Sequence, residues 1–286
     1  MKNTEQSRRR FLQVLGVGAA CLAGTDRCTA QVGSAAKVRK GEPKFELGLA
    51  SYTLREFKLE ETLAMTKKVG LKNICFKSMH LELDSTPAQI RATVQKVKDA
   101  GLSLYAGGVI GMKKEGQIHQ AFDYAKNAGM RVIIAAPSPE MLPLIEKKVK
   151  RYDIKVAIHN HGPGDELFPT PKVALEHIKN LDKRIGMCHD IGHTKRYGSD
   201  PIAETRLCGD RLHDVHIKDV SAANRNGHGV EIGRGVIDIP RFLRTLIKIG
   251  YDGIVSFEYE KDAKDPLAGL AESVGYVKGV LAAIGK

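Results

Sequence analysis

Short apolar segments alternate with amphipathic segments eight times between residue 44 and the end of the chain. The short segments are apolar throughout rather than at every second position, which is typical of parallel strands covered on both faces. The predicted strands are residues 45–51, 73–77, 102–107, 131–136, 155–162, 184–193, 211–219 and 253–260. The predicted helices are residues 59–69, 87–100, 117–128, 139–150, 171–179, 200–208, 239–249 and 266–284.

The residues between these segments support the same interpretation. Gly70, Gly101, Gly129 and Gly250 each end a periodic segment, where a glycine commonly closes a helix. Eight strand–helix units predict an α/β protein with a single closed (βα)8 barrel, a fold that needs about 250 residues. An open doubly wound sheet is the alternative. It is disfavoured because residues 51–55, after the first strand, hold no glycine-rich phosphate-binding sequence.

The N-terminus predicts an export signal. Ser7–Gln13, with the sequence SRRRFLQ, resembles a twin-arginine signal, and the apolar run Val14–Leu22 follows it. That run is too short to cross a membrane as a stable helix, so we expect no membrane span. We expect a periplasmic protein with a signal at residues 1–30, a polar lead-in at 31–43 and the barrel at 44–286.

The formal net charge of +12 does not indicate a nucleic-acid partner. The first 30 residues hold five basic and two acidic residues and contribute +3 of this charge. Much of the remainder is lysine on predicted helices, where it is solvated. A nucleic-acid groove would interleave basic residues with aromatic ones, yet the chain has no tryptophan and few aromatics.

The cysteines are interpreted as structural. Cys21 and Cys28 fall in the predicted signal, and the remaining three lack the spacing of a zinc knuckle. Cys75 and Cys188 lie inside apolar strand runs and are expected to be small buried hydrophobes, without a chemical role.

The last four predicted strands each end in an imidazole or a carboxylate. These residues are His159, Asp190, His216 and Glu258. All strands of a parallel barrel open onto one face at their C-terminal ends, so the four side chains are expected to converge there. Nitrogen and oxygen donors that meet in this way are typical of a divalent-metal site.

Two of these assignments have alternatives. On the seventh strand, residues 214 and 216 point the opposite way from 213, so His216 is chosen and His213 is expected to pack behind it. On the fifth strand His159 is the first choice, His161 the second and Glu166 the third. At this position on the fifth strand, a neutral imidazole can bind a metal ion as effectively as a carboxylate can.

Several further residues are expected to act on the substrate. Glu258 is a candidate for the catalytic base as well as a ligand, and His159 and His161 can act as bases because an ordinary imidazole pKa lies near 6.5. Lys218 is the fourth catalytic candidate. The expected substrate contacts are His193, Lys218, Arg55, Lys77, His80 and Glu260, which lie at strand ends or just beyond them.

Four segments resemble the xylose-isomerase-like TIM barrels, a family that includes sugar isomerases and epimerases, inosose dehydratases and endonuclease IV. They are Asp190–His193, His213–Asp219, Gly233–Asp238 and Val255–Glu258. The resemblance implies one divalent ion, Mn²⁺, Co²⁺ or Zn²⁺, that chelates a carbonyl and a neighbouring hydroxyl of a sugar. Asp190, His216 and Glu258 fall on the family's ligand positions.

The chain departs from this family on the fifth strand, where epimerases usually have a glutamate and this chain has His159. That glutamate pairs with the one on the eighth strand as two bases on opposite faces of a carbon. Its replacement favours proton abstraction at a single face. The resulting hypothesis is β-elimination from a 3-keto-glycoside, and the alternative is a sugar (phosphate) isomerase or epimerase acting on keto-sugars.

Two other classes fit the sequence less well. An abasic-site endonuclease needs a three-metal cluster and a DNA groove, and a non-catalytic sugar-binding module would have no use for the ion. The expected partner is therefore a small keto-sugar or glycoside. A homo-oligomer is compatible with the sequence, which does not specify one.

Overall fold

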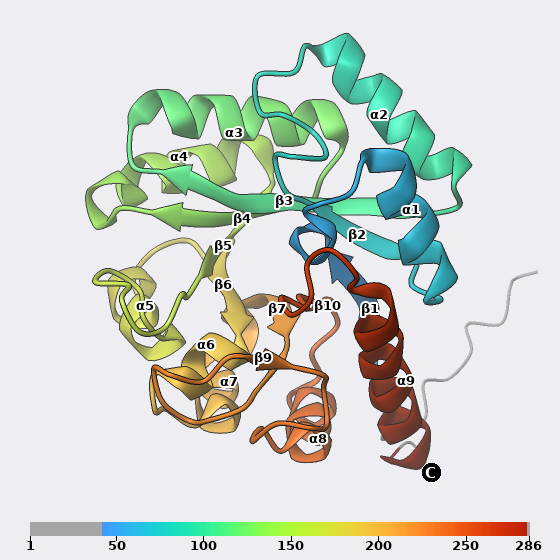
Figure 1. Cartoon of the computed structure of the whole chain (residues 1–286). Helices are drawn as coiled ribbons and strands as arrows, with labels where there is room; N and C mark the ends of the chain where they lie inside the picture. Colours follow the sequence, from blue (N-terminus) through green and yellow to red (C-terminus); the bar gives the residue numbers. More distant parts are fainter. Residues whose placement is uncertain (1–41, 285–286) are drawn as a thin grey trace, which may run out of the picture. The chain divides into compact units, whose positions relative to one another are not determined.

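The computed structural model describes residues 42–284, so the predicted signal lies outside the described residues. Eight parallel strands close into a barrel in the order β1–β10–β7–β6–β5–β4–β3–β2 (Figure 1). They are β1 (Glu46–Ala50), β2 (Asn73–Phe76), β3 (Ser103–Met112), β4 (Val132–Pro137), β5 (Lys155–His159), β6 (Ile185–Asp190), β7 (Leu212–Ile217) and β10 (Ile254–Phe257). The predicted (βα)8 barrel is confirmed.

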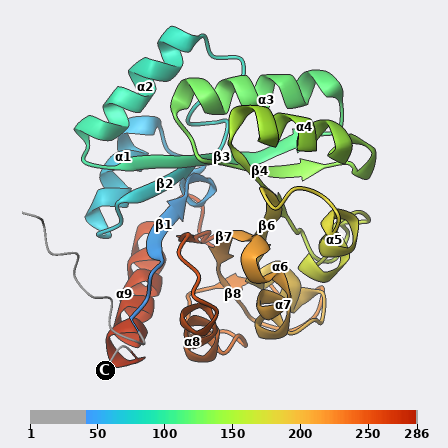
Figure 2. The same ribbon diagram turned by 180° about the vertical axis from the view of Figure 1, so that it is seen from behind.

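Helices surround the strands, as Figures 1 and 2 show from opposite sides. They are α1 (Leu59–Lys68), α2 (Pro87–Asp99), α3 (Glu115–Ala128), α4 (Leu142–Tyr152), α5 (Pro171–Ile178), α6 (Ile191–Arg196), α7 (Pro201–Cys208), α8 (Ile239–Ile249) and α9 (Leu267–Ile284). The predicted helix-ending glycines 70, 101, 129 and 250 all have positive φ angles. Glycine adopts this left-handed conformation without steric cost, which lets the chain turn back into the next strand.

The structure adds elements that the sequence pattern did not predict. The short helix α6 begins directly after β6, three 3₁₀ turns lie at Ser51–Leu54, Pro139–Met141 and Gly209–Arg211, and a small antiparallel hairpin joins β8 (Asp219–Val220) to β9 (Gly229–Val230). Strand β3 also extends to Met112, five residues beyond its predicted end. The consecutive glycines 107 and 108 concealed this extension because glycine has a low strand propensity.

The two faces of each strand meet different surroundings. Mostly small and mid-sized side chains fill the barrel interior, among them Cys75, Ala157 and Cys188, together with the larger Tyr105. The larger aliphatic and aromatic side chains point outward and pack beneath the helices as the main core. Within the interior, the hydroxyls of Tyr105 and Ser256 hydrogen-bond at 2.6 Å, which satisfies two polar groups that are cut off from water.

Helix α9 is long and apolar enough to meet the length and composition criteria for a membrane span, with a mean hydropathy of 1.4 over 18 residues. In the barrel it is the last outer helix, and it buries Leu270, Val274 and Val277 against the core. The ammonium group of Lys278 donates to the carbonyl of Gly70 at 3.0 Å. These contacts are those of a barrel helix, so length and composition are weak evidence for a span here.

One carboxylate organises the loop that follows the hairpin. Asp219 is fully buried, and it accepts hydrogen bonds from the backbone N–H groups of Val220, Gly233, Gly235 and Ile237. A Cβ at position 235 would collide with this carboxylate. The glycine therefore lets the backbone come close enough to donate its N–H.

Replacing Asp219 with alanine leaves several of these buried donors without an acceptor. We expect the Asp219→Ala variant to lose about 2–4 kcal/mol of unfolding free energy. Denaturant titration measures the loss, and hydrogen exchange localises it to residues 231–238. The matched change Asp210→Ala removes only an exposed partner of Lys183. Equal stability of the two variants would show that Asp219 does not anchor the loop.

Candidate metal centre

Strand order and register bring the predicted donors to the same end of the barrel. Asp190 is paired with His216 across β6 and β7, and His159 is the last residue of β5. Glu258 directly follows β10, where its backbone N–H donates to the carbonyl of Ile217. Because inward and outward residues alternate along a strand, all four side chains point into the barrel mouth.

The four donor atoms lie within 4.8 Å of one another, and all four residues are buried. His159 Nε2 is 3.1 Å from His216 Nδ1 and 3.5 Å from Asp190 Oδ2, and His216 Nδ1 is 3.3 Å from Glu258 Oε2. Neighbouring ligand atoms around a cation with bonds of about 2.1 Å lie about 3.0 Å apart in an octahedral site and about 3.4 Å apart in a tetrahedral one. The donor set and its spacing therefore fit one divalent cation.

The ammonium group of Lys218 balances the charge of the carboxylates. Its Nζ lies 2.8 Å from Asp190 Oδ2, 2.7 Å from Glu258 Oε2 and 2.8 Å from Glu260 Oε1. Two of these oxygens belong to the metal-fitting set. Lysine and a cation at this centre would therefore share the same acceptors.

Electrostatics favour the metal-binding protonation states of His159, Asp190 and Glu258. Burial lowers the pKa of His159 to about 3, so this ring is neutral near pH 7. Burial raises the pKa of both Asp190 and Glu258, but the nearby Lys218 and imidazoles outweigh it and hold both pKa values well below their usual range. Burial alone lowers the pKa of His216, yet the adjacent Glu258 carboxylate raises it overall.

A polar network behind the centre fixes the end of β6. The amide of Asn160 accepts from the backbone N–H of Asp190 at 3.0 Å and donates to the carbonyl of Asp190 at 3.2 Å. Asn160 also donates to Thr194, and Thr194 in turn contacts His189 at 2.9 Å. Sequence reasoning missed this network. Its only visible signal was Asn160 itself, placed between two histidines.

The structure distinguishes between the alternative ligand residues on strands five and seven. His161 contacts Asp165 at 3.3 Å, and its side chain is 41% exposed, so it lies at the mouth and outside the four-donor group. Glu166 is exposed in the following loop and also lies outside that group. His213 contacts the carbonyl of Lys183 at 2.8 Å, which confirms that it packs away from the centre.

The predicted substrate residues have different surroundings. His193 Nε2 lies 3.9 Å from Asp190 Oδ2, and Glu260 contacts Lys218, so both border the centre. Arg55 donates to the backbone carbonyls of Tyr52 and Glu260. These three residues are placed where a ligand at the mouth could meet them.

The other two predicted substrate residues, Lys77 and His80, also contact protein groups. Lys77 donates to the carbonyl of Val109 at 2.8 Å, and burial lowers its pKa. His80 is buried, with one ring nitrogen near Ser51 Oγ and the other near Thr62 Oγ1. The structure leaves His80 no free ring nitrogen for a sugar, and its position supports packing.

A closed parallel barrel with nitrogen and oxygen donors converging at its C-terminal face belongs to the class of TIM-barrel proteins with a candidate metal centre. The model of the xylose isomerase-like TIM barrel family matches residues 42–280. The chain belongs to this family, as the resemblance of its strand-end segments indicated.

Curated relatives match this chain over only part of their own length. The uncharacterized protein MJ1311 of Methanocaldococcus jannaschii is 34% identical over 119 residues, which cover 40% of this chain and 39% of the relative. The putative L-ribulose-5-phosphate 3-epimerase SgbU of Escherichia coli is 28% identical over 94 residues, or 31% of this chain and 33% of the relative. The chain thus spans less than half the length of these relatives.

Solved structures match over nearly their whole length. The IOLI protein, solved with a zinc atom, gives a TM-score of 0.70 at 18% identity and covers 84% of this chain and 99% of its own. An L-ribulose 3-epimerase gives a TM-score of 0.67 at 18% identity. The match covers 84% of this chain and 95% of the epimerase chain. The probable 3-DHS dehydratase AsbF of Bacillus anthracis gives a TM-score of 0.67 at 14% identity. The match covers 82% of this chain and 99% of the AsbF chain. At these identities the likeness shows a shared fold.

Buried neutral histidines should make the fold sensitive to acid. Burial lowers the pKa of His189 and of His213 to about 4. Between pH 6.5 and 4 the unfolded chain binds protons on these rings that the folded protein does not, so stability falls as pH falls. The loss approaches about 1.4 kcal/mol per pH unit for each histidine.

Denaturant unfolding between pH 4 and 6.5 measures this slope. The His189→Gln variant should show a shallower slope than the parent protein, and the exposed His177→Gln control should keep the parental one. A His189→Gln slope equal to that of the control would contradict the assignment.

Removing the ammonium group of Lys218 should expose the repulsion among the buried carboxylates. We expect metal-free Lys218→Met protein to melt below the parent, and added Zn²⁺ or Mn²⁺ to raise its melting temperature by more than the parent's. Differential scanning fluorimetry with and without the cation tests this. The exposed Lys179→Met change is the control. An equal metal-induced rise in both variants would show that Lys218 and the cation do not compete.

Proposed function

We propose that this protein is a divalent-metal-dependent enzyme that removes a proton next to a sugar ketone and eliminates the aglycone of a 3-keto-glycoside. The observation that carries the proposal is the buried group formed by His159, Asp190, His216 and Glu258. Its atoms have the spacing of four ligands around one divalent cation, and a five- or six-coordinate cation would keep positions open for a substrate. Donors of this kind suit a cation that polarises a carbonyl and a neighbouring hydroxyl.

The similar folds support a reaction of this chemical type. The structures that resemble this chain include an epimerase and a probable dehydratase, and the matched relatives include a putative epimerase. Epimerisation next to a carbonyl and elimination of a β-substituent can both begin by removing an acidic C–H proton. The two reactions diverge only after this proton has been removed.

The residue at the end of β5 favours elimination. Inversion of a carbon needs one base on each of its faces, and family epimerases use a carboxylate from the fifth strand opposite that of the eighth. This chain has His159 there, and His159 Nε2 faces the other donors at 3.1–4.0 Å. An imidazole held as a ligand in this way is not free to act as a second base.

The proposed reaction balances with groups that border the centre. A base takes the C2 proton, the electron pair of that C–H bond forms the C1=C2 double bond, and the C1–O bond breaks to release the aglycone. A bound cation would polarise the ketone and stabilise the negative charge that develops on its oxygen. The Lys218 ammonium lies beside the same centre and adds positive charge there.

Two side chains can move the protons. Glu258 is a carboxylate at neutral pH, and a carboxylate that binds a cation through one oxygen can accept a proton on the other. His161 is held by Asp165, which is itself fixed by the backbone N–H groups of Leu167 and Phe168. If Nδ1 of His161 carries the proton towards Asp165, Nε2 is free at the mouth, where it can exchange a proton with the substrate or the leaving oxygen.

The second candidate function is isomerisation or epimerisation of a keto-sugar, which the epimerase-like folds favour. We also propose export to the periplasm by the twin-arginine-type signal. An exported enzyme would meet free sugars and glycosides rather than phosphorylated metabolites. This location supports the glycoside over a sugar phosphate as the substrate.

Incubation with a chromogenic 3-keto-glycoside in deuterated buffer separates the two reactions. We expect release of the aglycone that chelation stops and that Mn²⁺, Co²⁺ or Zn²⁺ restores. Deuterium at C2 of an intact glycoside would instead identify epimerisation. The Glu258→Gln variant should lose at least about a hundredfold in rate. The exposed Glu272→Gln control, a partner of Arg234, should keep the parental rate.

If neither aglycone release nor deuterium exchange appears with any of the three cations, the proposed function is wrong.

A further inference from the structure

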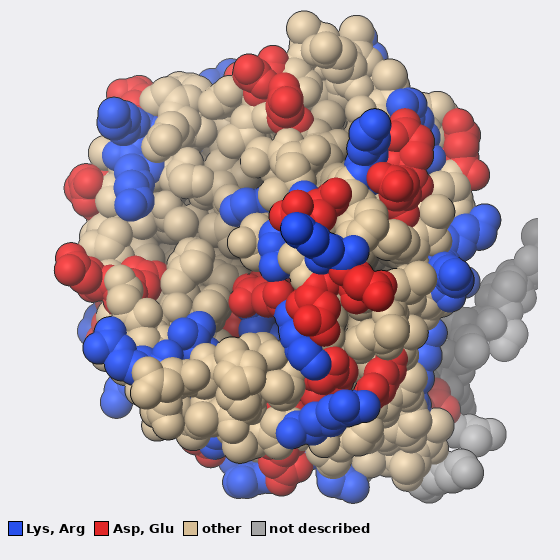
Figure 3. All heavy atoms as spheres, viewed as in Figure 1, with Lys and Arg blue, Asp and Glu red and all other residues tan. Residues whose placement is uncertain are grey.

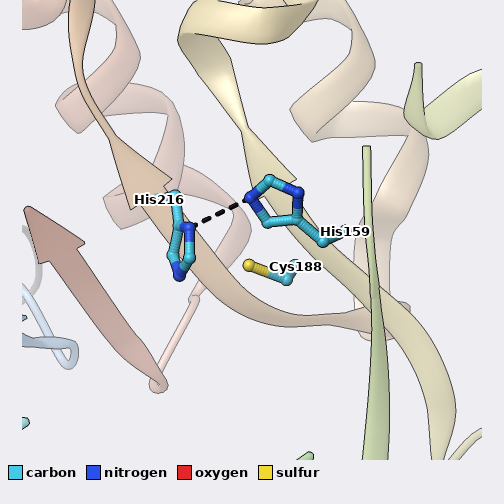
Figure 4. A group of neighbouring side chains, drawn as sticks. All are labelled: His159, Cys188 and His216. Atoms are coloured by element: carbon cyan, nitrogen blue, oxygen red, sulfur yellow. Dashed lines mark hydrogen bonds between the residues drawn. The ribbon is translucent and has the colours of Figure 1, made fainter. Parts of the chain in front are cut away.

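A thiol lies at the floor of the candidate metal centre. The donor atoms of His159, Cys188 and His216 are within 4.8 Å of one another, and all three residues are buried (Figure 4). In the figure the sulfur lies near the gap between the two imidazole rings, which approach each other at 3.1 Å. This group shares both histidines with the four-donor set and replaces its carboxylates with sulfur.

The position of the thiol follows from the strands. Cys188 stands two residues before Asp190 on β6, so both side chains point into the barrel, and it is paired with His159 across β5. It therefore lies deeper in the barrel than the Asp190 carboxylate, within reach of both imidazoles.

The surroundings of the thiol are polar although they lie deep in the barrel. Cys188 Sγ is 3.6 Å from Asp214 Oδ1, which in turn is 3.9 Å from His216 Nε2. Within residues 42–284, His216 Nε2 and Asp214 Oδ2 are buried atoms without a hydrogen-bond partner. Buried polar atoms are rarely left in this condition, so the polar groups around the thiol are not fully satisfied by the described residues.

We propose that Cys188 is a further ligand of this centre and makes it selective for thiophilic cations of the zinc class over Mn²⁺. The inference rests on the proposed function in that it concerns the same metal centre. Two overlapping ligand sets result: a harder one with Asp190 and Glu258, and a softer one with the cysteine.

Ligand chemistry explains the selectivity. Thiolate sulfur favours zinc-class and other soft cations, whereas carboxylate oxygen suits Mn²⁺ and Mg²⁺. Lys218 contacts the carboxylates and does not contact the sulfur, so it competes for the harder set alone. Coordination replaces the S–H bond with a metal–sulfur bond and releases one proton, and Asp214 Oδ1, 3.6 Å from the sulfur, is placed to accept it.

The chain supplies its own matched control. Cys75 is as deeply buried as Cys188 and belongs to the same group of barrel-interior side chains. It is absent from both donor groups found among the described residues. A Cys75→Ser change therefore introduces the same hydroxyl in the same interior without touching the centre.

Cobalt spectroscopy tests the ligand directly. Co²⁺ added to the metal-free parent protein should give a sulfur-to-cobalt charge-transfer band in the near ultraviolet. The band should be absent in Cys188→Ser and Cys188→Ala and present in Cys75→Ser. A cobalt-loaded parent protein without this band overturns the proposal while leaving the metal centre, and with it the proposed function, intact.

Competition between Zn²⁺ and Mn²⁺ tests the selectivity. Cys188→Ser should lower the ratio of zinc to manganese affinity by about tenfold or more, and Cys75→Ser should leave it unchanged. Circular dichroism of each metal-free variant confirms that it is folded. An unchanged ratio in folded Cys188→Ser overturns the inference. Failure of the parent protein to bind any of the cations overturns the proposed function as well.

Discussion

Closure of the barrel is the constraint on which the centre depends. The eight strands pair in a ring, so the C-terminal ends of β5, β6, β7 and β10 share one narrow opening. Pairing of Asp190 with His216, and of Val255 to Phe257 with Val215 to Ile217, leaves little freedom in the height of each donor. The donors converge because the backbone hydrogen bonds fix the register, before any side chain makes a contact.

This convergence brings like charges together in a buried place, which costs free energy unless a cation is present. Lys218 provides that positive charge from within the chain, with contacts of 2.7–2.8 Å to Asp190, Glu258 and Glu260. At the surface, by contrast, acidic and basic side chains are interspersed on the face seen in Figure 3. Exposed pairs such as Arg234 with Glu272 contribute little to stability there.

Strand-end reasoning predicted the four-donor group because it needed only local information: where each apolar run stops, and which residue stands there. The alternation of side chains also separated His216 from His213 correctly. The same reasoning failed for His80, whose two ring nitrogens are taken by Ser51 and Thr62 from other segments. It correctly predicted that Cys188 is buried, but a single apolar strand gives no sign of the two histidines near it.

The sequence by itself determined the barrel, its helix ends and the identity of the donors, because periodicity, glycine conformation and strand-end chemistry are properties of short segments. Only the tertiary structure decided that His159 rather than His161 or Glu166 lies in the donor group, that Lys218 neutralises it, and that a thiol lies beneath it. Those outcomes depend on distances between side chains carried by different strands. Such distances exist only once the ring has closed and the register is set.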